Sequence, residues 1–281
     1  MLKKAVIPAA GFGTRFLPAT KSQPKEMMTV VDTPTIQYVV EEAVAAGIDD
    51  ILMIIGKNKR AIEEYFDRNF ELENELAAKG KDDELRRIRR ISEMANVHFV
   101  WQKEMNGLGD AVSYARHHVG DEPFAVLLGD TIFDAETPVL NQLLKVFERY
   151  RDPVVALEEV EPDLVSRYGV ISGHAVEDGL YLVDDFVEKP APEDAPSNMV
   201  IASRYIFTPE IFDHLARVER GKNNEIQLTD AMRLMVRNRA MYGKRIQGSR
   251  QDIGNKLNFI KTNIAYGLKS PDIRDDLMRY L

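Results

Sequence analysis

The 281-residue chain contains no cysteine, and this absence removes several kinds of site at once. Disulfides, iron–sulfur clusters, cysteine-ligated zinc and thiol nucleophiles are all excluded. An excess of positive charge is also missing, since 45 acidic and 37 basic residues give a formal net charge of −8. Bulk attraction to nucleic acid depends on cations that neutralise phosphates, so we expect no nucleic-acid partner. A locally basic pocket for a small anion stays possible.

Long apolar runs are missing as well. No stretch approaches the roughly 18–20 apolar residues of a membrane span. The apolar run after the N-terminal lysines is too short for a signal-peptide core and ends at a glycine loop. We therefore expect a soluble, cytoplasmic protein with no membrane partner. The five histidines show no metal-ligand spacing, and His117 and His118 are expected at the surface, on opposite sides of a helix.

The first half of the chain alternates between strand-like and helix-like segments. Short apolar runs predict buried strands, helical spacing predicts helices, and strand-rich pieces broken by turn residues follow Pro153. This order predicts an α/β fold with a Rossmann-like mixed, mainly parallel sheet flanked by helices and a strand-rich extension. The expected strands are 4–10, 50–55, 97–101 and 124–128, and the expected helices are 34–46, 58–69, 109–118, 137–150, 209–218, 228–238 and 256–266.

Residues 71–94 differ in amino-acid composition from the rest of the chain. They are highly charged and carry a sparse apolar stripe that runs from Leu72 to Ile91. We expect a helical hairpin bent near Gly80. The stripe fits either a solvated excursion on the surface or a contact between subunits of an oligomer.

A glycine loop, Gly11-Phe12-Gly13-Thr14-Arg15, follows the first predicted strand directly. Ligands of parallel α/β sheets bind beyond the carboxyl ends of the strands, where glycines let backbone N–H groups approach an anion. The dinucleotide fingerprint GxGxxG fails because the sixth position is Phe16, which argues against an NAD-dependent oxidoreductase. A Walker-A loop also fails, because no Gly-Lys pair stands at the required place after these glycines. An ordinary turn remains the simplest reading of the two glycines alone.

Three cations, Arg15, Lys21 and Lys25, lie within the eleven residues from 15 to 25 of this acidic chain. The fork of arginine and the compact charge of lysine both suit phosphate oxygens. Pro18 and Pro24 would stiffen the loop that carries these cations. A long, rigid, basic loop that begins with glycines indicates a triphosphate site.

Polar residues also follow later strands. Asp130 follows the strand expected at 124–128 and fits either a turn or a Mg²⁺ ligand, because Mg²⁺ prefers one or two carboxylates together with phosphate oxygens. Gln102 follows Trp101 and could be a surface residue or match the edge of a pyrimidine base. Trp101 itself is more typical of a core than of a stacking platform.

These motifs together resemble those of sugar-1-phosphate nucleotidyltransferases, and of bacterial UTP–glucose-1-phosphate uridylyltransferases in particular. The resemblance rests on the loop GFGTRFLPATKSQPKEM and on DTPTIQYVVEEAVAAGI. It continues in the same order along nearly the whole chain through GLGDAV, GDEPFAV, YGVI, VEKP, NEIQLTDAM and DIGNKL. It implies the nucleotide-diphospho-sugar transferase fold and the transfer of UMP from UTP to glucose 1-phosphate, with release of pyrophosphate.

The resemblance also implies a role for each matching residue. The nucleotide would be bound by Ala10, Gly11, Gly13, Thr14, Gln102 and Gly107. The phosphates would be held by Arg15, Lys25 and Lys189, the sugar by Gly169 and Glu188, and Mg²⁺ by Asp130 and Asp252. No protein nucleophile is needed, because a sugar phosphate is already ionised at neutral pH.

Residues 1–281 are expected to form one domain, with a nucleotide-binding part at roughly 1–135, a sugar-binding part at 136–250 and C-terminal helices at 251–281. The expected partners are UTP and glucose 1-phosphate, and a homodimer or homotetramer is implied by the resemblance. Two alternatives stay open: a related transferase that uses dTTP or another nucleotide, and a regulatory paralogue that binds sugar nucleotides without catalysis.

Overall fold

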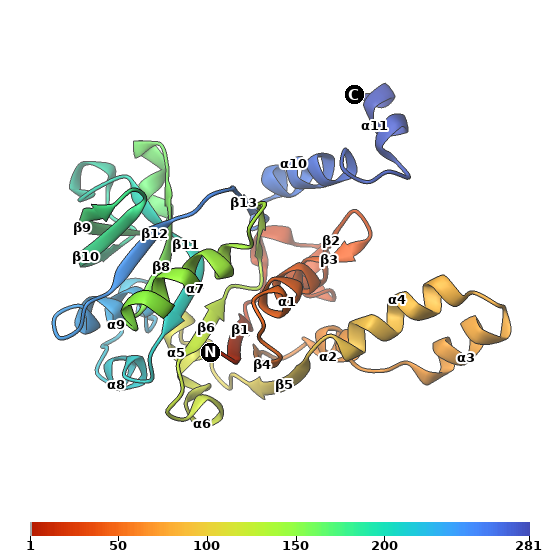
Figure 1. Cartoon of the computed structure of the whole chain (residues 1–281), viewed down its shortest axis with the longest axis horizontal. Coiled ribbons are helices and arrows are strands. Elements are labelled where there is room, and N and C mark those ends of the chain that lie inside the picture. Colours follow the sequence, from red (N-terminus) through yellow and green to blue (C-terminus); the bar gives the residue numbers. More distant parts are fainter. Residues whose placement is uncertain (1) are drawn as a thin grey trace.

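The computed structural model describes residues 2–281, apart from the side chains of Lys222 and Asp252. A nine-stranded sheet in the order β5-β4-β1-β6-β11-β8-β12-β10-β9 runs through the molecule (Figure 1). Its strands are β1 (Lys4–Ala9), β4 (Asp50–Ile55), β5 (Asn96–Trp101), β6 (Phe124–Leu127), β8 (Val154–Glu159), β9 (Gly169–Glu177), β10 (Leu180–Glu188), β11 (Met199–Phe207) and β12 (Tyr242–Arg245). Two small ribbons pair β2 (Thr29–Val30) with β3 (Thr33–Pro34) and β7 (Thr131–Asp134) with β13 (Ser249–Asp252).

The sheet has a parallel part and an antiparallel part. Strands β5, β4, β1 and β6 are all parallel, so their carboxyl ends meet at one edge. Strand β11 then runs antiparallel to both β6 and β8, and β10 runs antiparallel to β12 and β9, while β12 pairs parallel with β8. The predicted mixed α/β architecture with a strand-rich extension is therefore confirmed.

Helices cover both faces of the sheet. Along β4, Ile51, Met53 and Ile55 pack into one apolar cluster with helices α1 (Thr35–Ala45) and α7 (Val139–Tyr150). The alternate residues Leu52 and Ile54 pack into a second cluster on the other face. That cluster includes residues of α5 (Leu108–Ser113), α8 (Ile211–Leu215) and α9 (Leu228–Met235). A strand with apolar side chains on both faces belongs in the middle of such a sandwich.

Most predicted elements are present, with shifted ends. The helix expected at 58–69 is α2 (Arg60–Phe66), and the helix expected at 109–118 is divided into α5 and α6 (Arg116–Val119). Helix α1 begins at Thr35 because Thr33 and Pro34 pair with β2. The expectation of a buried Trp101 is wrong, because its side chain lies 66% exposed at the end of β5.

The charged segment forms the predicted helical hairpin. Helices α3 (Phe70–Ala78) and α4 (Asp82–Glu93) are joined at Gly80, whose φ of +66° is a left-handed conformation that favours glycine. The hairpin projects from the body of the molecule (Figure 1). Its helices are tied together by Glu73, which accepts hydrogen bonds from Arg68 and Arg89.

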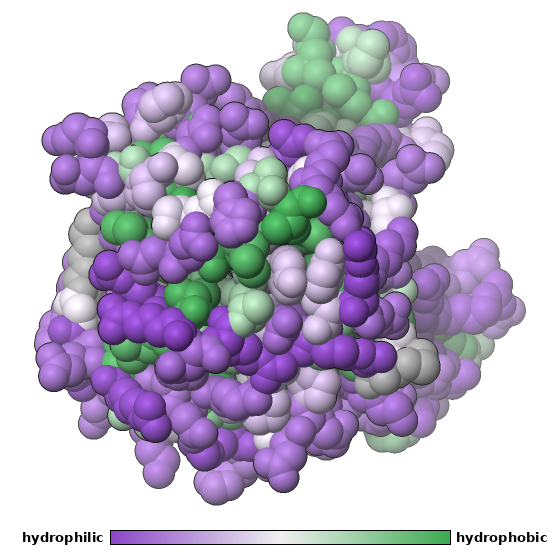
Figure 2. Space-filling model, turned by 60° about the vertical axis from the view of Figure 1, so that its left-hand side comes forward, coloured by the Kyte–Doolittle hydropathy of each residue, from purple (hydrophilic) through white to green (hydrophobic). Residues whose placement is uncertain are grey.

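The chain ends in two helices that also extend from the body, α10 (Lys256–Gly267) and α11 (Arg274–Tyr280) (Figure 1). The sequence predicted C-terminal helices at 251–281 but gave bounds only for the first, at 256–266. Apolar surface gathers at this end of the molecule (Figure 2), where Ile273, Met278 and Leu281 are exposed. Among the described residues, none of the helices combines the length and the apolar character needed to cross a bilayer.

Candidate active site

A cleft of about 420 Å³ opens at the carboxyl ends of β1, β5 and β6. Strand β1 leads into the glycine loop, β5 leads into Gln102, and β6 leads into Asp130. Eight of the thirteen residues implied by the resemblance line this cleft: Ala10, Gly11, Gly13, Thr14, Lys25, Gln102, Gly107 and Asp130. The parallel order of the three strands is what brings these distant segments together.

The glycine loop folds back on itself through two short 3₁₀ turns, Thr14–Phe16 and Ala19–Lys21, and is followed by a third at Lys25–Met27. Gly13 starts the first turn with φ +66°, and a Cβ there would lie 3.1 Å from side-chain atoms of both Lys25 and Thr20. The Thr20 hydroxyl donates to the Gly13 carbonyl at 2.8 Å. The second half of the loop therefore folds back over the first and brings Lys25 close to the glycines.

Lys25 and Asp130 form an ion pair in this cleft, with 2.5 Å between Nζ and Oδ2. Burial alone would lower the pKa of Lys25, but the charges of Asp130 and Glu26 outweigh it and raise that pKa above its usual value. Burial likewise acts to raise the pKa of Asp130, and the charge of Lys25 reverses the direction, so the pKa is lowered. Both groups are therefore charged at neutral pH.

A second ion pair lies directly behind the first. Glu26 and Lys59 are 1% and 5% exposed, and 2.7 Å separates Oε2 from Nζ. Burial raises the pKa of Glu26 and lowers that of Lys59, although each charge partly offsets the effect on the other. The pair fixes the main chain next to Lys25. Neither residue was predicted from the sequence, although Glu26 follows Lys25 directly.

Arg204 holds the turn that carries Asp130. Its side chain is fully buried and pairs with Glu42 at 3.0 and 2.7 Å. The same guanidinium donates to the carbonyls of Leu128 at 3.4 Å and Thr131 at 2.8 Å, on either side of Asp130. Arg204 was not predicted from the sequence either. A single cation within the apolar strand MVIASRYIF was the available signal, since a buried arginine requires partners.

Gln102 and Gly107 form the opposite wall. Gln102 is 5% exposed, and its Nε2 donates to the Gly107 carbonyl at 3.3 Å and to Asp110 Oδ2 at 2.7 Å. Gly107 has φ +104°, and a Cβ there would lie 2.8 Å from the Ile226 carbonyl oxygen. A glycine is thus required here both by the backbone angle and by the close approach of the neighbouring chain.

A second group of predicted residues gathers on the antiparallel part of the sheet. Glu188 ends β10 and pairs in register with Gly169, the first residue of β9. Its carboxylate contacts Lys189 at 2.6 Å and accepts a 2.6 Å hydrogen bond from the hydroxyl of Thr229. A Cβ at Gly169 would lie 3.3 Å from that carboxylate and 2.7 Å from Ile201 Cδ1. Thr229 lies within the motif NEIQLTDAM, but no role was predicted for it from the sequence.

Two predicted residues remain outside both groups. Arg15 is exposed beside the cleft, and its Nη1 donates to the Gly254 carbonyl at 3.5 Å. The backbone of Asp252 pairs with Thr131, the residue after Asp130, through the ribbon of β13 and β7. The side chain of Asp252 lies outside the described part of the structure, so its prediction as a metal ligand stays a prediction.

The chain matches proteins of one family over nearly its whole length. The family model described as nucleotidyl transferase matches residues 4–267. A UTP–glucose-1-phosphate uridylyltransferase of Bacillus subtilis is 51% identical over 280 residues, which cover 100% of this chain and 94% of that protein. One of Staphylococcus haemolyticus is also 51% identical, with 100% and 97% of the two chains covered.

Solved structures agree with this assignment. A UDP-glucose pyrophosphorylase in complex with UDP-glucose superposes with a TM-score of 0.88 at 44% identity, over 96% of this chain and 100% of that one. A UTP-bound enzyme of Acinetobacter baumannii gives 0.92 at 40% identity, over 100% and 98%. The resemblance seen in the sequence is confirmed, and the chain belongs to the nucleotidyl transferase family, among the UTP–glucose-1-phosphate uridylyltransferases.

Proposed function

We propose that the chain transfers the uridylyl group of UTP to glucose 1-phosphate, forming UDP-glucose and pyrophosphate. One observation carries this proposal beyond the family match. A glycine loop, an ionised Lys25–Asp130 pair and a buried glutamine line a single cleft at the carboxyl ends of parallel strands. Such a cleft offers backbone N–H groups and positive charge to phosphates, and an amide to a base edge.

The reaction is an in-line displacement. A phosphate oxygen of glucose 1-phosphate attacks the α-phosphorus of UTP, and the bond from that phosphorus to the bridging oxygen of pyrophosphate breaks. The two substrates are both anions, so the protein's main tasks are to position them and to neutralise charge. The loop from Gly11 to Arg15 is proposed to hold the β- and γ-phosphates, and Lys25 and Lys189 the phosphate of the sugar.

The Lys25–Asp130 contact suggests how the site changes when substrate arrives. In the free protein the Lys25 ammonium is neutralised by Asp130, which keeps both charges stable in the cleft. Incoming phosphate oxygens offer Lys25 new acceptors. We propose that Lys25 then shares its hydrogen bonds between Asp130 and substrate, so the cation is already in place before catalysis.

Asp130 suits a hard divalent cation such as Mg²⁺. Its carboxylate lines the cleft and is ionised, since Lys25 lowers its pKa. Bound Mg²⁺ would neutralise phosphate oxygens and template their approach. Asp252 is the second proposed ligand, because the register of β13 on β7 places its backbone beside Thr131.

The residues around Glu188 are proposed to hold the sugar. A carboxylate offers two acceptor oxygens and so suits adjacent sugar hydroxyls. Thr229 orients one of these oxygens by donating to it at 2.6 Å, and Gly169 keeps the space beside it free of a side chain. On this proposal residues 1–135 mainly serve the nucleotide and residues 136–250 mainly serve the sugar.

The assembly is proposed to be a homodimer or homotetramer. Exposed apolar side chains on the two projecting parts of the molecule offer contact surfaces, with Phe70 61% exposed on α3 and Met278 60% exposed on α11. Light scattering on the purified protein measures the mass in solution. A monomer at micromolar concentration would contradict this part of the proposal.

The function is tested by incubating the purified protein with Mg²⁺, glucose 1-phosphate and each of UTP, dTTP, ATP, CTP and GTP, and measuring pyrophosphate. Release with UTP, dependent on glucose 1-phosphate, is the expected result. Stronger release with dTTP would keep the mechanism and change the product, since one methyl group gives only about 1–3 kcal/mol of discrimination. Binding of UDP-glucose without any turnover would overturn the proposed activity.

A further inference from the structure

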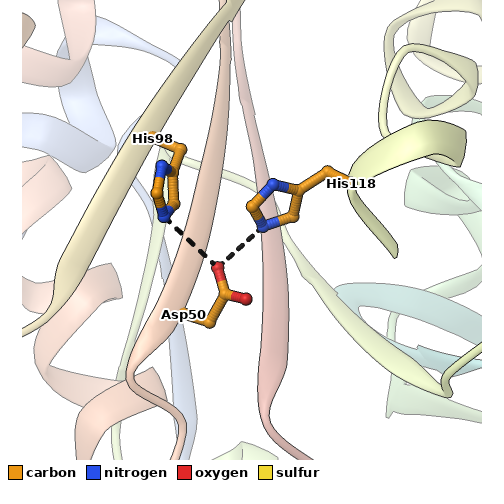
Figure 3. Close-up of side chains that lie close together, drawn as sticks. All are labelled: Asp50, His98 and His118. Carbon is orange, nitrogen blue, oxygen red and sulfur yellow. Dashed lines mark hydrogen bonds and ion pairs between the residues drawn. The ribbon is translucent and has the colours of Figure 1, made fainter. Parts of the chain in front are cut away.

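Two histidines that are far apart in the sequence meet one aspartate at the edge of the sheet away from the cleft. Asp50 is the first residue of β4, His98 lies in β5, and His118 lies in the short helix α6 before β6. These three residues, hereafter the His–Asp cluster, each offer one ligand atom, and the three atoms lie within 4.8 Å of one another. Figure 3 shows both imidazole rings aimed at the same carboxylate oxygen.

The fold sets the positions of all three side chains. In the parallel pairing of β4 with β5, Asp50 lies opposite Asn96, so His98 is the next residue on the same face. The end of α6 is held beside this point by Lys4, whose ammonium donates to the carbonyls of His118 at 3.0 Å and Val119 at 3.2 Å. The cluster therefore rests on a strand pair and an anchored helix end, which are rigid elements.

The distances are close to those of a metal site. Nε2 of His98 lies 3.8 Å from Asp50 Oδ1, which is too far for a hydrogen bond. Two ligands of one tetrahedral Zn²⁺, at bonds of about 2.0–2.1 Å, lie roughly 3.3–3.5 Å apart. Nε2 of His118 lies 2.7 Å from the same oxygen, as a hydrogen bond requires. An ion could replace this hydrogen bond after a ring shift of less than about 1 Å.

The charges around the His–Asp cluster allow a cation. Lys4, whose ammonium contacts the His118 carbonyl, is already paired with Glu122 at 2.9 Å. The His98 side chain is 54% exposed, so an ion can reach the cluster from solvent and keep water in a fourth position. The two rings lie 5.0 Å apart at 53°, which leaves both Nε2 atoms facing the carboxylate.

We propose that Asp50, His98 and His118 form a binding site for a divalent transition-metal ion, best matched by Zn²⁺, separate from the catalytic cleft. Two imidazole nitrogens and one carboxylate oxygen select Zn²⁺, Ni²⁺ or Cu²⁺ over Mg²⁺, which prefers oxygen ligands. A bound ion would connect β4, β5 and α6 and so stabilise this edge of the sheet. The site is independent of the proposed function, since none of its residues lines the cleft.

The test is equilibrium dialysis of the full chain against ZnCl₂ with excess Mg²⁺ present, so that oxygen-only sites are filled. The chain lacks cysteine, which removes thiolates as competing ligands. The wild type is expected to take up one Zn²⁺ per chain. His98→Ala and His118→Ala should each weaken this binding by at least about tenfold, the lower bound seen when even an outer-shell partner is removed.

Two matched controls come from the same chain. His117 is exposed on the same helix as His118, and His174 pairs with Asp184 at 3.5 Å, with no third ligand beside them among the described residues. His117→Ala and His174→Ala should bind Zn²⁺ as tightly as the wild type. Weaker binding in either control, or full binding in the His98 and His118 variants, would overturn the proposal.

A second readout covers the folding of the variants. Zn²⁺ should raise the Tm of the wild type and of His117→Ala, because a ligand that binds only the folded state stabilises it. The Tm of His118→Ala should not respond to Zn²⁺, although its metal-free value should show that it is folded. Stoichiometric binding that leaves the wild-type Tm unchanged, or no binding at micromolar protein, would contradict the site.

Discussion

Replacing Lys25 by alanine removes the cation of the cleft and leaves the Asp130 carboxylate unpaired. The two side chains are 23% and 29% exposed, so the ion pair is neither buried nor fully solvated. Exposed pairs contribute about 0–1 kcal/mol to stability, and breaking a buried pair costs about 3–5 kcal/mol. We therefore expect Lys25→Ala to lower the free energy of unfolding by roughly 1–3 kcal/mol, which a domain of ordinary stability survives.

The expected effect on catalysis is larger than the effect on stability. Losing one preorganised charge that stabilises a transition state costs about 10²–10³ in rate, or roughly 3–4 kcal/mol. Lys25→Ala should show this loss in kcat for pyrophosphate release at saturating UTP and glucose 1-phosphate. Thermal unfolding of the same preparation establishes that the variant is folded.

Lys21→Ala is the matched control for this experiment. Lys21 belongs to the same loop and carries the same charge, but it is exposed and does not line the cleft. Its replacement should leave kcat within about the twofold range expected of a surface substitution. A folded Lys25→Ala protein with full activity would contradict the proposed role of Lys25, as would an equal loss of activity in both variants.

Three further changes test other parts of the account. Thr229→Val removes the hydroxyl that donates to Glu188, so the KM for glucose 1-phosphate should rise about tenfold or more while the KM for UTP stays constant. Equal rises in the two KM values would contradict a sugar-binding role for Glu188. Gly107→Ala places a Cβ 2.8 Å from the Ile226 carbonyl oxygen in a backbone with φ +104°. The affinity for UTP should fall by an amount that corresponds to about 1–3 kcal/mol of strain. An unchanged affinity in calorimetry would contradict the required glycine. Glu73→Gln tests pH dependence, because hydrogen bonds from two arginines lower the pKa of Glu73 from 4.5 to about 2. A carboxylate with a lowered pKa stabilises the folded protein at pH values above its unfolded pKa, and this stabilisation is lost as the pH falls. The difference between Glu73→Gln and the wild type in the hydrogen exchange of α3 should therefore persist at neutral pH and disappear between pH 4.5 and 2.

The architecture could be predicted from the sequence where the apolar pattern of each segment agreed with the order of strands and helices along the chain. Apolar runs such as DILMII are buried on both faces, so they predict a central strand without knowledge of its neighbours. The glycine loop, with its three cations, likewise indicated an anion site directly after the first strand. Parallel topology then required that this loop and Asp130 lie at the same edge, and the structure places both in one cleft.

The supporting residues could not be found in the same way. Arg204 and the Glu26–Lys59 pair act through contacts between segments far apart in the chain, such as the 2.7 Å hydrogen bond from Arg204 to Glu42. A charged residue in a strand signals that partners exist but does not identify them. The sequence therefore indicated several side chains that line the cleft, and only the structure shows what holds them in place.

The His–Asp cluster also could not be predicted from the sequence. The spacing of the histidines excluded only metal motifs made within one helix, and it could not exclude a site built from three segments. His118 was expected at the surface, yet it is half-buried and hydrogen-bonded to Asp50. The pairing of β4 with β5, and the anchoring of α6 by Lys4, bring these residues together.

A crystal structure of the wild-type protein with UDP-glucose tests the central claim most directly. We expect the uracil ring beside Gln102 and Gly107, the phosphates over the Gly11 loop, and the glucose hydroxyls on Glu188. A product molecule in another hollow, such as the one of about 510 Å³ lined by Arg116 and Asp213, would contradict it. So would a glucose ring that makes no contact with Glu188.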